Sequence, residues 1–143
     1  MLRNSTFDIH VIYQKNGSAT FSRWTNNSGL NWSSEVSVGT SCIDATMAIN
    51  ATDDLVVVCN ATTGTYTSVD NGATWTQIST AQKGTRPSCY MWNNTLSCVY
   101  YFNASGTTYV NYTRSFLANY SGWMTPLNLT LLTTGEVVGS PTL

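Results

Sequence analysis

Ser68-Val69-Asp70-Asn71-Gly72-Ala73-Thr74-Trp75 is the stretch of this 143-residue chain that decides its fold. Short carboxylate or amide side chains accept backbone N–H groups in turns, and glycine adopts positive φ without a steric cost. A tryptophan directly after such a turn buries its ring against neighbouring strands. The stretch therefore predicts a tight turn between two strands, held against the core by Trp75.

Two weaker copies of this pattern occur elsewhere in the chain. Thr25-Asn26-Asn27-Ser28-Gly29-Leu30-Asn31-Trp32 has Asn27 in place of the aspartate, and Asn forms the same kind of side-chain turn. A third copy ends in Gly122-Trp123 and keeps neither the acid nor its amide substitute. The three tryptophans are 43 and 48 residues apart. This spacing is typical of the four-stranded blades of a β-propeller.

The 68–75 stretch resembles the Asp-box, the bacterial-neuraminidase-type repeat, at Ser68, Asp70, Gly72, Thr74 and Trp75. The weaker copy resembles it at Thr25, Asn27, Gly29 and Trp32. The resemblance implies sialidase-like propeller blades. Asp-boxes also occur in non-catalytic receptor ectodomains, lectins and assembly factors, so the resemblance implies a fold more than an activity.

Family sialidases use three arginines for the substrate carboxylate, a Tyr/Glu nucleophile pair and an acidic residue. The arginines and glutamates of this chain are too few and too dispersed to match that set; they are Arg3, Arg23, Arg86, Arg114, Glu35 and Glu136. Arg86-Pro87 resembles the family's arginine motif only faintly and lies on the wrong repeat. We therefore assign no catalytic residue from the resemblance and expect a protein that is not an enzyme.

The repeat predicts one all-β domain over 1–143, with antiparallel blades at about 5–38, 39–83 and 84–138 and a closing strand at 139–143. First strands are expected at 39–42, 84–89 and 139–143. Second strands are expected at 7–13, 55–59 and 96–102, where β-branched and aromatic residues concentrate. Third strands are expected at 19–24, 64–69 and 107–115, and a fourth strand follows each box tryptophan.

Composition excludes several function classes. Only 9% of residues are charged, six Lys and Arg oppose seven Asp and Glu, and no cationic cluster for nucleic acid exists. The longest apolar run, around 55–59, is far below the ~20 residues that a membrane span needs. Thr, Ser and Asn number 23, 16 and 14, a composition that favours strands and turns over helices.

N-glycosylation sequons, Asn-x-Ser/Thr, are the strongest compositional signal. With 39 Ser and Thr in 143 residues, chance would place about four of the 14 asparagines in sequons. Eleven asparagines lie in one: Asn4, Asn16, Asn26, Asn31, Asn50, Asn60, Asn93, Asn103, Asn111, Asn119 and Asn128. Several fall at predicted turns, which are accessible to modification. We expect a secreted, heavily N-glycosylated extracellular protein.

The four cysteines fit the same scheme. Four cysteines allow three pairings, and Cys42–Cys59 with Cys89–Cys98 is the one that is symmetric with the repeat, each pair facing itself across a hairpin of first and second strands. A zinc site is the competing interpretation, but the chain has no C-x-x-C spacing and one histidine, His10. We expect two disulfides, and no metal or cofactor.

Three blades are too few to close a propeller, which typically has four to eight. Because the chain is expected to begin at a second strand and to end at a first, its missing pieces are complementary. Residues 139–143 of one copy are predicted to pair with 7–13 of another, giving a closed two-fold dimer or an open filament. The third possibility is that the sequence is an excerpt from a longer propeller.

Other candidate sites have ordinary structural explanations. Asp53-Asp54 lies in a predicted turn, and His10 lies in a predicted strand without a nearby nucleophile pattern. The aromatics of 100–102, with Tyr109 and Tyr112, suit a sugar-stacking platform or a propeller core. Two function classes remain: a self-associating structural or adhesive subunit, and a lectin-like module or sialidase-type glycosidase fragment with a carbohydrate ligand.

Overall fold

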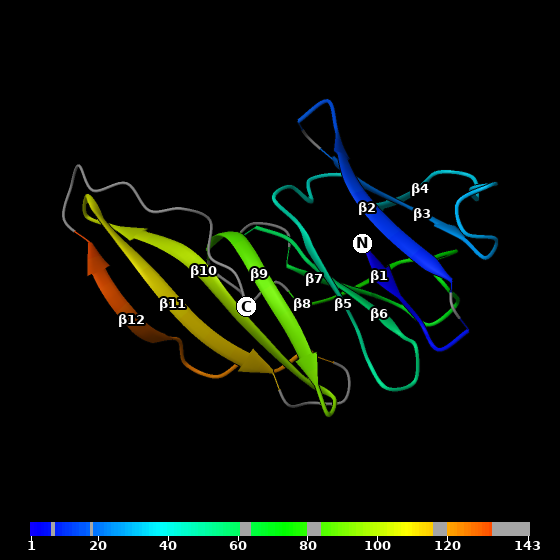
Figure 1. Cartoon of the computed structure of the whole chain (residues 1–143). Coiled ribbons are helices and arrows are strands. Elements are labelled where there is room, and N and C mark those ends of the chain that lie inside the picture. Colours follow the sequence, from blue (N-terminus) through cyan, green and yellow to red (C-terminus); the bar gives the residue numbers. More distant parts are fainter. Residues whose placement is uncertain (7, 18, 61–63, 80–83, 116–119, 133–143) are drawn as a thin grey trace.

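The computed structural model describes residues 1–6, 8–17, 19–60, 64–79, 84–115 and 120–132, which form strands and turns. Their twelve strands make three antiparallel sheets of four, and consecutive strands are neighbours in each sheet (Figure 1). The first sheet contains β1 (Leu2–Arg3), β2 (Ile9–Lys15), β3 (Ala19–Thr25) and β4 (Val36–Gly39). The second contains β5 (Thr46–Ile49), β6 (Leu55–Val58), β7 (Thr65–Ser68) and β8 (Thr76–Ser79). The third contains β9 (Thr85–Trp92), β10 (Thr95–Ala104), β11 (Thr107–Ser115) and β12 (Leu127–Leu132).

The predicted all-β fold of about three four-stranded blades is confirmed. The second, third and fourth strands of each blade lie close to where the sequence places them. Within the described part of the chain, no helix has the length and apolar character needed to cross a membrane.

Two predictions of first strands are wrong. The segment 39–42 is a turn, in which Gly39 ends β4 and its carbonyl accepts the N–H of Cys42 at 3.3 Å; the first strand of the second blade is β5. The first blade also has a first strand of its own, because β1 pairs Leu2 with His10 and Arg3 with Ile9. The predicted closing strand at 139–143 lies outside the described residues.

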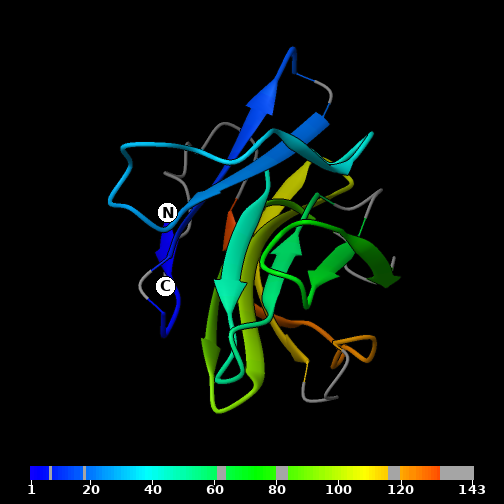
Figure 2. The same ribbon diagram turned by 90° about the vertical axis from the view of Figure 1, so that its right-hand side faces the viewer.

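The second sheet lies between the other two (Figures 1 and 2). Strand β5 contacts both β1 and β9, so the first strands of the three sheets run beside one another. This arrangement, with sheets spreading outward from neighbouring first strands, is that of consecutive propeller blades.

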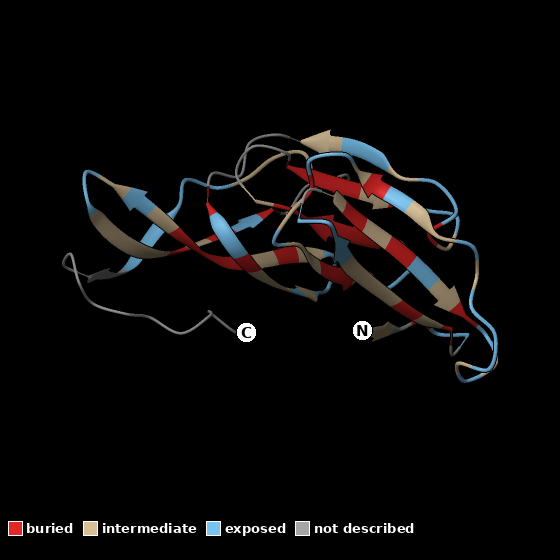
Figure 3. Cartoon of the chain, turned by 90° about the horizontal axis from the view of Figure 1, so that it is seen from above, coloured by how far each residue is buried: buried red, intermediate tan, exposed pale blue. Residues whose placement is uncertain are grey.

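Two apolar cores join the sheets, because successive side chains of a strand point to opposite faces. Val57 and Met47 face the first sheet, where they pack in a core that includes Ile12 and Val38. Val56 and Val58 face the third sheet, where they pack with Leu96 and its neighbours. Figure 3 shows the buried residues gathered where the sheets face each other.

Candidate assembly surface

The loop at 68–75 is a closed set of hydrogen bonds. Asp70 Oδ1 accepts the Ser68 hydroxyl at 2.7 Å and the Thr74 N–H at 2.8 Å, and Asp70 Oδ2 accepts the Thr74 hydroxyl at 2.5 Å. Ser68 Oγ in turn accepts the N–H of Gly72, whose φ is +83°. The Thr74 hydroxyl and N–H and the Ser68 hydroxyl together hold the pKa of Asp70 below its usual range.

Trp75, at the end of this loop, connects the second blade to the first. Its Nε1 donates to Ser22 Oγ on β3 at 2.9 Å, and its ring packs on the core between the two sheets. The 68–75 loop therefore attaches the second blade to the first; we call such a contact between neighbouring blades a joint.

The loop at 25–32 repeats the same hydrogen bonds with an amide in place of the carboxylate. Asn27 Oδ1 accepts the Thr25 hydroxyl at 2.8 Å and the Asn31 N–H at 2.9 Å, and Thr25 Oγ1 accepts the Gly29 N–H at 3.2 Å. Trp32, however, is 39% exposed and belongs to neither core. The expected burial of a box tryptophan fails here, since no other described sheet packs against that face of the first one.

Trp123 occupies the corresponding place in the third blade, although its loop lacks the box residues. It packs on the core between the second and third sheets. Its Nε1 and the Thr65 hydroxyl are buried, and neither has a hydrogen-bond partner within the described structure. Thr65 precedes Ser68 by three residues, just as Ser22 precedes Thr25. The Trp123 Nε1 and Thr65 hydroxyl therefore occupy the places that Trp75 Nε1 and Ser22 Oγ occupy between the first two blades.

The outer face of the first blade is half-exposed and partly aromatic. Strand alternation places Val11, Tyr13 and Phe21 on the face opposite Ile12, which packs toward the second sheet. The Tyr13 and Phe21 rings are 6.3 Å apart, and Lys15 Nζ lies 5.4 Å from the Phe21 ring centre. Glu35 accepts bonds from Tyr13 at 2.5 Å and from Lys15 at 3.0 Å.

These contacts set the titration of the two partners on that face. The Tyr13 hydroxyl, followed by the Lys15 ammonium, holds the pKa of Glu35 below its usual range. The bond to Glu35 raises the pKa of Tyr13. The Glu35 carboxylate therefore carries its charge on a face that presents the Lys15 ammonium beside the Tyr13 and Phe21 rings.

The outer face of the third blade is also apolar. Met91 packs toward the second sheet, so Trp92 and Tyr90 lie on the opposite face of β9. Trp92 is 72% exposed, and Leu127 on β12 is 61% exposed. Each end of the row of three blades thus presents apolar side chains to solvent.

A polar cluster between the 4–8 turn and the 68–75 loop also joins the first two blades. Asp8 Oδ2 accepts bonds from Asn71 at 3.0 Å and from Asn4 at 3.2 Å. Burial raises the pKa of Asp8, but the bonds from Asn71, Asn4 and Thr6 outweigh it and hold the pKa below its usual range. His10 is buried beside Asp8, and burial lowers its pKa although the charges of Asp8 and Asp53 oppose this.

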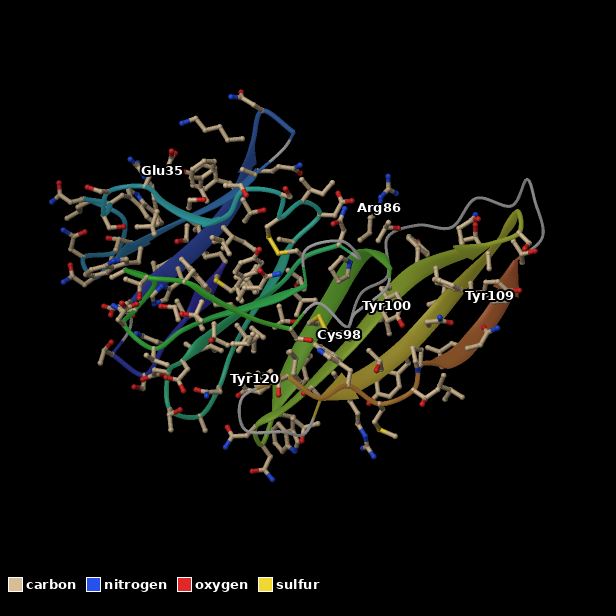
Figure 4. The ribbon with its side chains drawn as sticks, turned by 180° about the vertical axis from the view of Figure 1, so that it is seen from behind. Glu35, Arg86, Cys98, Tyr100, Tyr109 and Tyr120 are labelled. Carbon is tan, nitrogen blue, oxygen red and sulfur yellow. A yellow bond between two sulfur atoms is a disulfide. The ribbon has the colours of Figure 1, made fainter. Side chains whose placement is uncertain are left out.

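The structure separates the residues that sequence analysis considered for chemistry. Asp54 accepts the Asn50 amide within its own turn, and Asp53 accepts the Ser5 N–H of the first blade at 3.0 Å, so both carboxylates have structural partners. Glu35 lies just before β4 of the first sheet and Arg86 lies on β9 of the third, so the two are not neighbours (Figure 4). Among the described residues no three His, Cys, Asp or Glu side chains gather in a group that could hold a metal.

The proposed aromatic platform is divided between core and two faces. Tyr100 and Tyr101 are buried. Tyr109 packs near Phe102 with ring centres 6.2 Å apart, whereas Tyr112 points to the opposite face of the same strand. Figure 4 shows Tyr109 near the far end of the third sheet, away from Tyr100.

Both cysteine pairs are disulfide-bonded, Cys42 with Cys59 and Cys89 with Cys98. The second pair links directly opposite residues of β9 and β10. The first encloses the β5–β6 hairpin at its base, because Cys42 lies before β5 and Cys59 follows β6. Two disulfides indicate an oxidising, extracellular-type environment.

The sequons fall into three groups by exposure. Asn4 and Asn111 are buried, Asn50 and Asn60 are half-buried, and Asn119 lies outside the described residues. The exposed group is Asn16, Asn26, Asn31, Asn93, Asn103 and Asn128.

Ser22, Asn71 and Ser5 are joint residues that sequence analysis missed. Each bonds to a partner far away in the sequence, as Ser22 does to Trp75 across 53 residues. A faint signal existed for Ser22, since it precedes its box by three residues, as Thr65 does in the next repeat.

No family model and no curated protein sequence matches this chain. Among solved structures, the chain is similar to an α-L-arabinofuranosidase from Fusarium graminearum, determined with an iminosugar inhibitor. The TM-score is 0.60, the sequence identity is 10%, and the match covers 92% of this chain and 48% of that one. The chain thus spans about half the length of the structure it matches, which is a β-propeller. The shared fold is that of propeller blades.

Proposed function

We propose that this protein is a non-catalytic, N-glycosylated extracellular structural or adhesive subunit, whose three blades join a second copy to complete a six-bladed ring. The observation that carries the proposal is Trp32. Trp75 and Trp123 each pack into the joint between their own blade and the preceding one, and Trp32 has the same local geometry with no blade to receive it.

The two outer faces supply the surfaces for this joint. In a two-fold pair, the first blade of each copy meets the third blade of the other, so Trp32, Val11 and Tyr13 face a surface that includes Trp92 and Leu127. The match of 92% of this chain to 48% of a β-propeller supports propeller-type packing of its blades.

Strand donation remains part of the proposal. Among the described strands, β1 pairs with β2 at Ile9 and His10, and none pairs with the 11–15 segment of that β2 edge, which we propose receives a strand from another copy. Residues 139–143 are our candidate for that strand. An open-ended version of the same exchange would give a filament.

The non-catalytic assignment rests on the carboxylates. Glycosidases generally need two carboxyl groups across the scissile bond, one with a raised pKa. Every aspartate or glutamate of the described region whose pKa is shifted has it lowered. A cavity of about 230 Å³ between the first two sheets has one carboxylate, Asp44, in its described lining.

The second candidate is a glycan-binding module or a glycosidase fragment. The similarity to an arabinofuranosidase favours this second candidate. It predicts binding of a pentose or sialic-acid oligosaccharide, measurable by calorimetry on the assembled protein.

The proposal is tested by the native mass after enzymatic removal of N-glycans. The wild-type chain is expected at about twice 15.6 kDa, and Trp32→Glu is expected at 15.6 kDa with an unchanged circular dichroism spectrum. Val69→Glu is the matched control, because Val69 is 81% exposed in the corresponding loop of the second blade. A wild-type monomer, or a Trp32→Glu variant that still pairs, would overturn the proposed joint.

A further inference from the structure

Two of the eleven sequons belong to a longer pattern, Asn-x-Thr-x-Asp. It occurs at Asn4-Ser5-Thr6-Phe7-Asp8 and at Asn50-Ala51-Thr52-Asp53-Asp54. Both copies connect a first strand to a second strand, one in each of the first two blades. In both, the asparagine that would carry a glycan is also part of the turn.

In the 50–54 turn, both ends of the Asn50 amide are used. Asn50 Oδ1 accepts the N–H of Asp54 at 2.8 Å and that of Thr52 at 2.9 Å. Asn50 Nδ2 donates to Asp54 Oδ2 at 2.9 Å. The Thr52 hydroxyl lies 2.9 Å from Asn50 Oδ1 and 2.8 Å from Asp54 Oδ2, so the second sequon residue joins the same network.

The 4–8 turn reproduces these contacts. Asn4 Oδ1 accepts the N–H of Asp8 at 2.8 Å, and Asn4 Nδ2 donates to Asp8 Oδ2 at 3.2 Å. The Thr6 hydroxyl lies 2.9 Å from Asn4 Oδ1 and 3.0 Å from Asp8 Oδ2. Two segments with different intervening residues thus adopt one side-chain network.

The same Nδ2 atoms also reach the next blade. Asn4 Nδ2 donates to Asn71 Oδ1 at 3.3 Å, and Asn50 Nδ2 donates to the Tyr120 hydroxyl at 3.2 Å. Asn71 and Tyr120 occupy similar places, just before the box tryptophan of their blades, and both have positive φ, 61° and 53°. Each asparagine therefore ties its own turn to the loop of the following blade.

The third blade has no such network. Its first and second strands are joined by the two-residue turn Asn93-Asn94, with φ of 45° and 59°, as a tight hairpin requires. Asn93 is exposed.

N-glycosylation consumes one of the two N–H groups of an asparagine. A bond forms between Nδ2 and C1 of a carrier-linked oligosaccharide, the bond from C1 to the carrier phosphate breaks, and Nδ2 loses a proton. At Asn4 and Asn50 both N–H groups are engaged, one in the turn and one across the joint. Asn4 is moreover only 9% exposed, which leaves no room for a sugar.

We infer that Asn4 and Asn50 stay unmodified in the folded protein and act as structural clamps between blades, while the exposed sequons carry the glycans. This inference rests on the proposed function for the presence of glycans, but the clamp itself rests on the hydrogen bonds alone.

Site occupancy is measured on the secreted protein by peptide N-glycosidase treatment in heavy-oxygen water, followed by peptide mass spectrometry. The label is expected at Asn26 and Asn93 and absent from Asn4 and Asn50. Labelling of Asn50 at the stoichiometry of Asn26 would overturn the inference. If no sequon were labelled, the glycoprotein part of the proposed function would be overturned. The structural role of Asn4 and Asn50 would then be decided by the second measurement.

The second measurement compares Asn50→Ala with Asn26→Ala. Asn50→Ala is expected to lower Tm by about 5 °C or more without changing the glycan mass. Asn26→Ala is the matched control, because Asn26 is exposed; it should remove one glycan mass and leave Tm unchanged. Thr52→Ser keeps both the sequon and the hydroxyl and should leave both readouts unchanged. An unchanged Tm for Asn50→Ala would refute the clamp.

Discussion

Replacing Trp75 with Phe tests the joint between the first two blades. The bond from Trp75 Nε1 to Ser22 Oγ is 2.9 Å long and partly buried, and such a bond contributes about 1 kcal/mol. The smaller ring forfeits roughly 40 Å² of apolar contact, about 1 kcal/mol at 25 cal/mol per Å². The variant should therefore lose about 2 kcal/mol, or about 4–8 °C in Tm for a domain of this size.

Trp32→Phe is the matched comparison, because the two residues end loops with the same hydrogen-bond pattern. In dilute monomer, the loss should be below about 0.5 kcal/mol, since Trp32 is exposed and lies in neither core. Calorimetric unfolding at neutral pH with the disulfides intact measures both variants. If Trp32→Phe and Trp75→Phe lowered the unfolding free energy of the monomer equally, the contact of Trp75 with the first blade would not be what stabilises the protein, and the role assigned to that contact would be refuted.

Three further outcomes are expected. Burial holds the pKa of His10 below its ordinary 6.5, so the unfolded chain binds more protons as pH falls below 6.5, and the unfolding free energy should decline there; His10→Gln should flatten this part of a Tm-against-pH curve. The Thr74 hydroxyl and N–H hold the pKa of Asp70 below 3.8, so its stabilisation is present above that pH and is lost as pH falls through the lower, folded-state pKa; Asp70→Asn should weaken this acid dependence. Double substitution of Cys42 and Cys59 by Ala, which opens a loop of 17 residues, should cost about 3 kcal/mol in denaturant titrations; a loss below 1 kcal/mol would contradict it.

The strands were predictable where a run of residues carries its own signal. β6 is four consecutive apolar residues, and β10 and β11 are long and rich in aromatics. β1 has two residues, which is too short for any periodicity. The 39–42 segment matches 84–89 in its Gly-Thr opening and its cysteine, yet Thr20 Oγ1 donates to the Cys42 carbonyl at 2.6 Å and fixes a turn there.

The candidate site was predictable in its local part alone. The hydrogen bonds of the 68–75 loop join residues within the loop, so eight residues of sequence are enough to predict it. The joint depends on Ser22, and the turn networks depend on an aspartate four residues beyond each sequon asparagine. A sequon is defined over three residues, so its definition ends before Asp8 and Asp54 and cannot separate a clamp from a modification site.

Each joint in this molecule has a direction, from the tryptophan loop of one blade to the third strand of the blade before it. A row of blades therefore ends with two unmatched surfaces. One is the exposed Trp32 loop of the first blade, and the other is the third strand of the third blade. In the proposed ring, a polypeptide that carried this sequence twice in tandem would bring the Trp32 loop of one repeat against the third blade of the other within one chain, and would need no partner. A ring held by symmetry and a ring held by peptide bonds would then differ by a single gene duplication.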